Sequence, residues 1–224
     1  PADGNGEVSI DATASPITKP DGEIAGVVVI LRDVGELRGM AREMSYQASH
    51  DALTGLVNRR EFERQVNISV ESAKADGAQH VLCYMDLDHF KAVNDTCGHM
   101  AGDSMLREVA GLLRKQVRDS DIVGRIGGDE FAMLLPGCPL DKGRQIAEDV
   151  CTAVREYRFV WQDRIFEIGI SVGLVEIAQQ VSSLEEVLNA ADSACYVAKQ
   201  EGRGRVHIYS ARDAQNVNHR GDVH

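Results

Sequence analysis

Four acidic residues lie in two short segments where strands are expected to end or begin. Asp86 and Asp88 end an apolar run, and Asp129 and Glu130 directly follow a Gly-Gly pair. Carboxylate oxygens with few histidines nearby suit a hard cation such as Mg²⁺. Acidic residues at strand ends are also common turn residues and helix caps, so the spacing leaves both roles open. A regular strand points Asp129 and Glu130 to opposite faces, so both can bind metal only if the turn distorts the strand's start.

Further polar residues follow the first acidic pair. Asp88 is expected to cap a short helix over residues 89–94, on which Lys91 and Asn94 share a face. A solvated face on a short helix is the simpler interpretation of that pair.

Three more polar residues fall at expected helix ends. Asp103 follows a stretch with two glycines and is expected in the first turn of a helix, where a carboxylate is favoured electrostatically. Lys199 and Arg203 are four residues apart at the expected end of the last helix, where positive charge is favoured for structural reasons. Gly202 and Gly204 would let the backbone there approach a phosphate closely.

The elements that must position these residues alternate between helical and strand patterns. Apolar residues spaced three and four apart predict helices, and short apolar runs predict strands. A Gly-Gly pair suits a tight hairpin turn, so two strands are expected to meet across residues 127–128. The pattern predicts an α/β (α+β) fold, a sheet with helices packed on it. Helices are expected near residues 59–74, 105–117, 146–154 and 184–195, and strands near 80–87, 122–125, 131–135, 159–161, 166–175 and 206–209.

The first 48 residues form a separate pattern. The alternating residues 8–14, a Lys-Pro-Asp-Gly turn and the apolar run 27–31 predict a β-hairpin. Two strands alone are marginally stable in water, so the hairpin is expected to be the tail of a truncated sheet domain or a pairing element. A helix with one apolar stripe, which could pair with a second copy, is expected next. The stripe consists of Leu37, Met40, Ala41, Met44 and Ala48.

Composition and charge argue against several classes of protein. The 24 Lys and Arg against 35 Asp and Glu give the 224 residues a net charge of −11, which argues against a nucleic-acid polymer or an anionic membrane as partner. The five scattered cysteines favour a reduced, cytoplasmic setting. The longest apolar run, 24–31, is too short to span a bilayer, and no signal peptide is expected. Both ends are expected to be cut from a longer chain, which could still be tethered to a membrane.

Seven segments, in order along the chain, together resemble the GGDEF family of diguanylate cyclases. The likeness covers about residues 48–210 and is far more specific than a lone Gly-Gly-Asp-Glu-Phe. It implies a central, mostly antiparallel sheet flanked by helices, like that of nucleotidyl cyclases. The segments are residues 51–60, 86–91, 94–95, 98–99, 102–103, 127–131 and 198–203.

The resemblance also implies an order of domains. Residues 1–33 are similar, more weakly, to the C-terminal strands of a PAS sensor domain, and residues 34–50 would be a signalling linker helix. Residues 51–210 would be the catalytic domain, and 211–224 a polar tail. This tail resembles the stretch that leads into an EAL phosphodiesterase domain in many members.

The reaction implied by the family joins two GTP molecules. Each 3′-hydroxyl attacks the other's α-phosphate, which gives cyclic di-GMP and two pyrophosphates. By resemblance Asp86, Glu130 and the backbone carbonyl of Leu87 hold Mg²⁺, for which Mn²⁺ could substitute. Asp129 would bind metal and help deprotonate the attacking hydroxyl, and Lys91 would stabilise charge on the transferred phosphate.

The remaining substrate contacts are implied in the same way. Lys199 and Arg203 would hold the outer phosphates. Asn94 and Asp103 match the family's guanine contacts, and His99 lies in the same pocket. A carboxylate can accept from guanine N1–H and its 2-amino group, which adenine cannot offer, so GTP is expected over ATP.

Arg118 and Asp121 stand where the family's inhibitory Arg-x-x-Asp motif stands. The hypothesis is that the product, cyclic di-GMP, binds there and inhibits the enzyme. The alternative is an exposed polar turn. Arg144 is a candidate for a second basic residue by proximity alone.

One site holds one GTP, so activity is expected to require a homodimer. The main alternative is a catalytically silent GGDEF domain, which would bind GTP or cyclic di-GMP and regulate a neighbouring phosphodiesterase domain. The matched metal and signature residues favour the enzyme.

Overall fold

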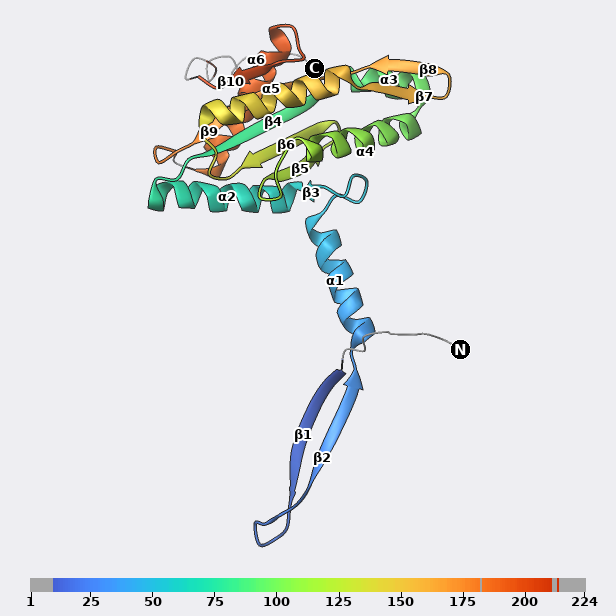
Figure 1. Ribbon diagram of the computed structural model, residues 1–224, viewed down its shortest axis with the longest axis vertical. Coiled ribbons are helices and arrows are strands. Elements are labelled where there is room, and N and C mark those ends of the chain that lie inside the picture. Colours follow the sequence, from blue (N-terminus) through green and yellow to red (C-terminus); the bar gives the residue numbers. More distant parts are fainter. Residues whose placement is uncertain (1–9, 182, 211–212, 214–224) are drawn as a thin grey trace. The chain divides into compact units, whose positions relative to one another are not determined.

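The N-terminal part of the chain consists of a hairpin and a helix. The computed structural model describes residues 10–181, 183–210 and 213, and the chain forms two compact units, residues 1–48 and 49–224. Strands β1 (Ile10–Thr18) and β2 (Ile24–Asp33) pair antiparallel, which confirms the predicted hairpin (Figure 1). Helix α1 (Gly35–Ser49) follows and confirms that a helix comes after the hairpin.

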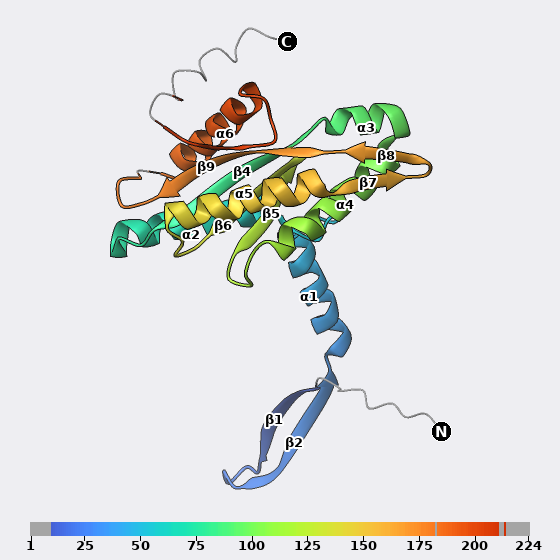
Figure 2. The ribbon, with the colours of Figure 1, turned by 45° about the horizontal axis from the view of Figure 1, so that its top comes forward.

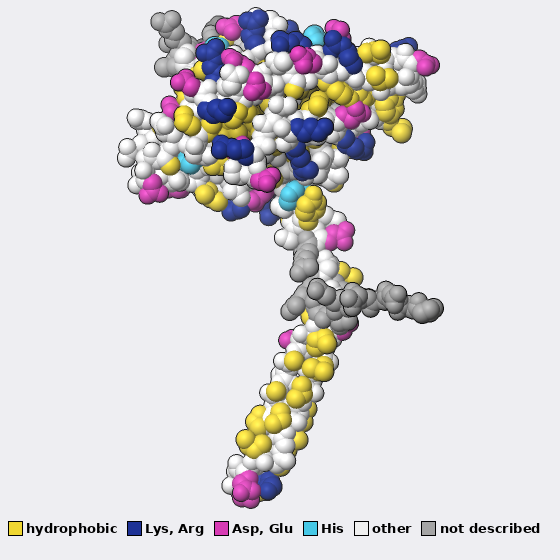
Figure 3. Space-filling view, viewed as in Figure 1, with side chains coloured by type: hydrophobic (Ala, Val, Ile, Leu, Met, Phe, Trp, Pro, Cys, Tyr) yellow, Lys and Arg dark blue, Asp and Glu magenta, His cyan; other side chains and the backbone are white. Residues whose placement is uncertain are grey.

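The apolar side chains of this hairpin are exposed to solvent. Residues 27–31 all remain exposed, and hydrophobic side chains line the two strands in Figure 3. On α1, Met40 and Met44 are exposed, whereas the side chains of Leu37 and Ala41 lie outside the described part of the chain. A two-stranded ribbon with apolar residues open on its surface is marginal alone in water, so the expectation of a further partner stands as a prediction.

The second unit is built on a six-stranded sheet with the order β10-β9-β4-β6-β5-β3. The three central pairs are antiparallel, and the two edge strands pair in parallel with their neighbours. This confirms the mostly antiparallel sheet expected from the sequence. The strands are β3 (Val57–Asn58), β4 (His80–Asp88), β5 (Ile122–Gly127), β6 (Glu130–Leu135), β9 (Gly169–Ile177) and β10 (Val206–Ile208).

Helices cover both faces of this sheet (Figure 2). Alternate residues of β4 enter two different cores: Leu82 packs with residues of α2 and α6, and Cys83 packs with residues of α4 and α5. A strand buried on both faces explains why its sequence is a nearly continuous apolar run. The helices are α2 (Arg59–Asp76), α3 (Phe90–Cys97), α4 (His99–Lys115), α5 (Leu140–Glu156) and α6 (Leu184–Gln200).

Helix α6 lies unusually close to β9 at one glycine. A Cβ added to Gly173 would lie 2.1 Å from both the carbonyl oxygen of Ala191 and the backbone nitrogen of Cys195. Only a residue without a side chain permits this approach. Gly173 therefore sets the position of α6 on the sheet.

A separate hairpin precedes β9. Strands β7 (Arg158–Trp161) and β8 (Arg164–Glu167) pair antiparallel with each other and do not join the larger sheet. The predicted single strand over 166–175 is thus two strands, β8 and β9. Among the described residues, no helix is long and apolar enough to cross a membrane.

Candidate active site

The register of two central strands brings the predicted acidic residues together. Asp86 of β4 lies directly opposite Glu130 of β6. The Leu87 backbone N–H donates to the Asp129 carbonyl oxygen at 3.2 Å. In an extended strand the N–H and C=O of one residue point to the same neighbour, so the Leu87 carbonyl also faces the turn between β5 and β6.

The turn between β5 and β6 explains how Asp129 and Glu130 can serve one site, although neighbouring residues of a regular strand point to opposite faces. Asp129 lies in the turn and only Glu130 begins the strand. The register shifts between Arg125 and Gly127, and Gly128 has a φ of 44°, a conformation that glycine adopts easily. The distortion required for both carboxylates to serve one site is therefore present.

A lysine from α6 compensates for the charge of this cluster. Lys199 Nζ lies 2.6 Å from Asp86 Oδ2. Burial raises the pKa of Asp86, the contact with Lys199 opposes that shift, and the Asp129 and Glu130 carboxylates add to it. Asp86 thus sits among negative charges and attracts cations.

The acidic residues do not form a ready metal cage. Over the described ranges, no group of three or more His, Cys, Asp or Glu side chains is arranged to hold a metal ion. The donor types nevertheless fit a hard cation, since the Asp86, Asp129 and Glu130 carboxylates and the Leu87 carbonyl are all oxygen ligands.

Glu130 also borders a cavity between the sheet and helices α2 and α6. The cavity has a volume of about 310 Å³, and Arg59, Tyr84 and Asp192 contribute to its walls. Burial raises the pKa of Tyr84, and Glu130 adds to the shift, so the phenol stays neutral beside this carboxylate. Sequence reasoning missed Tyr84, because the available signal was one polar group in an apolar strand.

The expected capping role of Asp88 is wrong. The residue before α3 is His89, whose φ is 64° and whose side chain makes no capping hydrogen bond. Asp88 instead accepts hydrogen bonds from the Ser171 hydroxyl and the Gly204 backbone N–H. Asp88 lies on the face of β4 that packs against α2 and α6, so its carboxylate meets partners from β9 and from the turn after α6 instead of the start of α3.

The expected guanine contacts lie on α3 and α4. Asn94 is half-buried, and its Oδ1 has no hydrogen-bond partner in the part of the chain that the structure describes. Lys91, His99 and Asp103 are exposed. Asp103 lies in the second turn of α4, not in the first as expected, because the helix already begins at His99.

The two expected phosphate contacts are not both helical. Lys199 lies in the last turn of α6, but the helix ends at Gln200 and Arg203 follows in a turn with a φ of 62°. The expectation that both residues lie at the end of the last helix is therefore wrong for Arg203. Arg203 Nε lies 4.0 Å from Asp88 Oδ1, and its side chain is half exposed.

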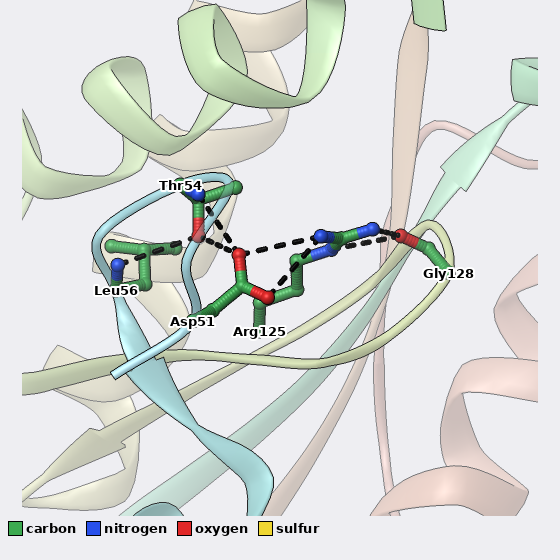
Figure 4. A network of polar contacts seen from close by, with 5 residues as sticks. All are labelled: Asp51, Thr54, Leu56, Arg125 and Gly128. Atoms are coloured by element: carbon green, nitrogen blue, oxygen red, sulfur yellow. Dashed lines mark hydrogen bonds and ion pairs between the residues drawn. The ribbon is translucent and has the colours of Figure 1, made fainter. Parts of the chain in front are cut away.

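A polar network that sequence reasoning missed connects the turn over residues 51–56 with the turn over residues 128–129, called the signature turn below (Figure 4). The Asp51 carboxylate accepts from the backbone N–H and hydroxyl of Thr54 and lies 3.3 Å from Arg125. Arg125 in turn donates to the Gly128 carbonyl at 2.8 and 3.0 Å. The available sequence signal for this network was Arg125 itself, a charged residue in the otherwise apolar β5.

Arg118 and Asp121 form a tight turn between α4 and β5. The Arg118 backbone N–H donates to Asp121 Oδ2 at 2.9 Å, and the two side chains approach to 3.5 Å. The Asp121 side chain is buried, and its Oδ1 has no hydrogen-bond partner within residues 10–181, 183–210 and 213, while Arg118 is exposed. Both border a cavity of about 280 Å³ that Arg114 also lines.

Arg144 is absent from the lining of that cavity. It lies on α5, where its Nε contacts Glu148 Oε1 at 2.8 Å in an exposed pair one helical turn apart. The structure offers Arg114, not Arg144, as the second arginine near Arg118.

Comparison with known proteins shows the same domain elsewhere. Residues 48–205 match the family model described as diguanylate cyclase, GGDEF domain. The chain is 43% identical over 209 residues to the probable diguanylate cyclase DgcE of Escherichia coli, which is 93% of this chain and 19% of that protein. It is 31% identical to the cyclic di-GMP phosphodiesterase PdeB of Shewanella oneidensis, over 92% of this chain and 24% of that protein. The chain thus spans less than a quarter of these two relatives.

A solved structure agrees with the fold. The coiled coil and GGDEF domain of DgcB from Caulobacter crescentus, in complex with c-di-GMP, matches with a TM-score of 0.74 and 30% identity. The match covers 78% of this chain and 93% of that one.

Proposed function

Because this chain belongs to the GGDEF domain family of diguanylate cyclases, we propose that it condenses two GTP molecules into cyclic di-GMP and two pyrophosphates. The observation that carries the proposal is the register of β4 and β6, which places Asp86 opposite Glu130 and next to the turn that contains Asp129. In each half of the reaction a bond forms between the 3′-oxygen and the partner's α-phosphorus. The α–β bond breaks, and pyrophosphate leaves with the electron pair.

The carboxylates have two roles in this proposal, metal binding and proton transfer. Asp86, Glu130 and the Leu87 carbonyl would hold Mg²⁺, or Mn²⁺ in its place. When bound, such a cation neutralises phosphate charge and favours the ionised form of the attacking hydroxyl. Asp129 accepts the proton of the 3′-hydroxyl, and Lys91 stabilises the charge on the transferred phosphate.

Lys199 changes partner when substrate arrives. Its ammonium lies 2.6 Å from Asp86 in the free protein and stabilises a crowded carboxylate. A triphosphate offers it more negative charge, so Lys199 moves to the outer phosphates together with Arg203, and Asp86 becomes free to bind metal.

Residues of α3 and α4, which follow one another directly, select the nucleobase of the substrate. The buried Asn94 Oδ1 has no hydrogen-bond partner among the described residues, so a donor on the ligand would remove the cost of leaving it unpaired. Guanine supplies the N1–H and 2-amino donors that Asn94 and Asp103 accept, and His99 borders the same pocket. GTP is therefore the substrate rather than ATP.

Product inhibition is assigned to Arg118 and Asp121. The exposed Arg118 guanidinium can bind a phosphate or a guanine of cyclic di-GMP, and the buried Asp121 carboxylate holds the turn by accepting from the Arg118 backbone N–H. The resulting complex lowers activity by binding a state in which two active sites do not meet.

The enzyme works as a cytoplasmic homodimer, since one site holds one GTP. Residues 1–33 are assigned to the end of a PAS-like sensor, 34–50 to the linker helix and 51–210 to the catalytic domain. The polar segment 211–224, outside the described residues apart from Asp213, would lead to a further domain.

Incubation of the chain with GTP and Mg²⁺, followed by chromatographic analysis, tests the proposal. Cyclic di-GMP and pyrophosphate are expected in a ratio of one to two, with Asp129→Ala inactive and with ATP a far poorer substrate. Omission of the divalent cation should abolish turnover, and Mn²⁺ should restore it. Comparable rates with GTP and ATP would contradict the assignment of guanine contacts.

A silent domain is the second candidate, because one relative of similar coverage is a phosphodiesterase. Tight binding of GTP without any turnover would favour it.

A further inference from the structure

Three consecutive residues after α6 have positive φ angles. The values are 116° for Gly202, 62° for Arg203 and 59° for Gly204. Glycine adopts this region freely, whereas arginine rarely does. The surrounding contacts must therefore hold Arg203 in place.

Asp88, the last residue of the central strand β4, supplies one such contact through the residue after Arg203, Gly204. Its side chain is 3% exposed, and its Oδ2 accepts from the Gly204 backbone N–H at 3.0 Å. Its Oδ1 accepts from the Ser171 hydroxyl at 2.8 Å. A buried carboxylate is stable only with partners of this kind.

The opposite strand leaves room for this arrangement. Gly169 of β9 is the register partner of Asp88, and a Cβ there would lie 2.9 Å from Asp88 Oδ2. The carboxylate thus occupies the space of a missing side chain and reaches Gly204, which is 116 residues away in the sequence.

Asp86 and Asp88 therefore have different tasks, although they are two residues apart on the same face of β4. Asp86 lies at the signature turn and contacts Lys199. Both oxygens of Asp88 already accept hydrogen bonds within the protein, one of them from the turn that carries Arg203.

We infer that Asp88 is a positioning residue, which anchors the turn at Gly204 and thereby aims Arg203 at the outer phosphates of GTP. The inference rests on the proposed function, because it assigns Arg203 to phosphate. Asp88 acts on substrate only through Arg203.

Steady-state kinetics of Asp88→Asn tests this role. The amide keeps the size of the side chain but removes its charge and replaces one of the two acceptor oxygens, which bind the Ser171 hydroxyl and the Gly204 N–H, with an NH2 donor. The KM for GTP is expected to rise about tenfold with kcat within about twofold of the parent, because a ground-state phosphate contact is lost. A fall in kcat at unchanged KM would overturn the inference.

A double-mutant cycle separates positioning from general damage. If Asp88 acts through Arg203, Asp88→Asn combined with Arg203→Ala should have no higher KM than Arg203→Ala alone. Additive effects would overturn the inference. Ser171→Ala is the matched control, since it removes the other buried partner of the same carboxylate without touching the turn, and it should leave KM within about twofold.

A measurement on the unmodified chain covers the case in which Asp88→Asn does not fold. The Gly204 amide, bonded to a buried carboxylate, is expected to exchange its hydrogen at least about tenfold more slowly than the neighbouring Gly202 amide. Equal exchange rates would overturn the inference. Absence of turnover in the parent chain would instead contradict the proposed function and leave this comparison intact.

Discussion

The side chain of Asn94 lies against helix α4 at a position where only glycine fits. A Cβ added to Gly102 would lie 2.1 Å from Asn94 Oδ1 and 3.0 Å from the ring of Phe90. Gly102→Ala is therefore expected to displace the amide and to raise the KM for GTP about tenfold, with a smaller effect on kcat. Kinetics with GTP measure the change. Gly111→Ala, on the same helix with no atom near the added Cβ, serves as control, and equal KM values for the two variants would contradict the explanation.

The proposed inhibitory pair, Arg118 and Asp121, leads to a second prediction for a single residue. Arg118→Ala removes the exposed guanidinium beside Asp121, so the inhibition constant for cyclic di-GMP is expected to rise about tenfold or more. Initial rates at increasing cyclic di-GMP concentration measure it. Arg144→Ala should leave the constant unchanged, because Arg144 pairs with Glu148 away from the cavity. A variant at Arg118 as sensitive as the parent would remove the site.

Sequence reasoning located single residues well where their role depended on local chemistry. The paired carboxylates and the Gly-Gly turn were found because strand ends and tight turns leave composition signals. The role of Asp88 and the contacts of Arg125 were not, because each depends on a hydrogen bond to a residue distant along the chain. Nothing in the local sequence distinguishes a carboxylate that binds substrate from one that anchors a loop.

Among the elements, the turn over residues 51–56 depends on the ionised form of Asp51. Burial alone would raise the pKa of Asp51, but hydrogen bonds from Thr54 and the nearby Arg125 outweigh it and lower the pKa. A lowered pKa stabilises the folded state above the unfolded value of 3.8, and this stabilisation is lost as the pH falls through the folded value. Asp51→Asn is expected to cost about 1–2 kcal/mol at neutral pH.

Urea unfolding of the parent and Asp51→Asn at several pH values checks this prediction. The difference between them should shrink as the pH falls below about 4, where the unfolded parent chain takes up a proton at Asp51, and should vanish below the lowered pKa of Asp51 in the folded state. Asp163→Asn, in the exposed turn between β7 and β8, is the control with no expected difference. A gap between parent and variant that stays constant with pH would contradict the ionic role.

The contact of α6 with β9 makes a packing prediction. Gly173→Ala places a methyl group 2.1 Å from backbone atoms, so it should destabilise the fold by about 3 kcal/mol or more. Gly111→Ala on α4 should instead stabilise it by about 0.5–1 kcal/mol, because alanine is the better helix former and the site is open. Chemical denaturation measures both, and a neutral Gly173→Ala would show that α6 can shift freely.

Element boundaries were predicted less well than element types. The helix containing Asp103 begins earlier than expected because Gly98, with a φ of 81°, allows α3 and α4 to follow one another directly. The last helix ends before Arg203 because two glycines flank that residue. Helix ends depend on such single backbone angles, which periodicity does not report.

For the molecule as a whole, the proposed activity depends on a second copy. Specific activity should therefore rise with protein concentration as dimers form. Met44→Glu, on the exposed stripe of α1, is expected to weaken dimerisation and lower specific activity at least about tenfold at a fixed concentration, since it buries charge at the contact. Sedimentation and turnover are measured together. Ile68→Glu, an exposed apolar residue of α2, is the control, and a fully active monomer would contradict the requirement for pairing.

The strand order has a consequence for how this domain combines with others. The chain enters the sheet at β3 on one edge and leaves it after β10 on the other, while Asp86 and Glu130 lie on the central strands. Another domain can therefore be attached before β3 or after β10 without any change to the central strands that carry the candidate site.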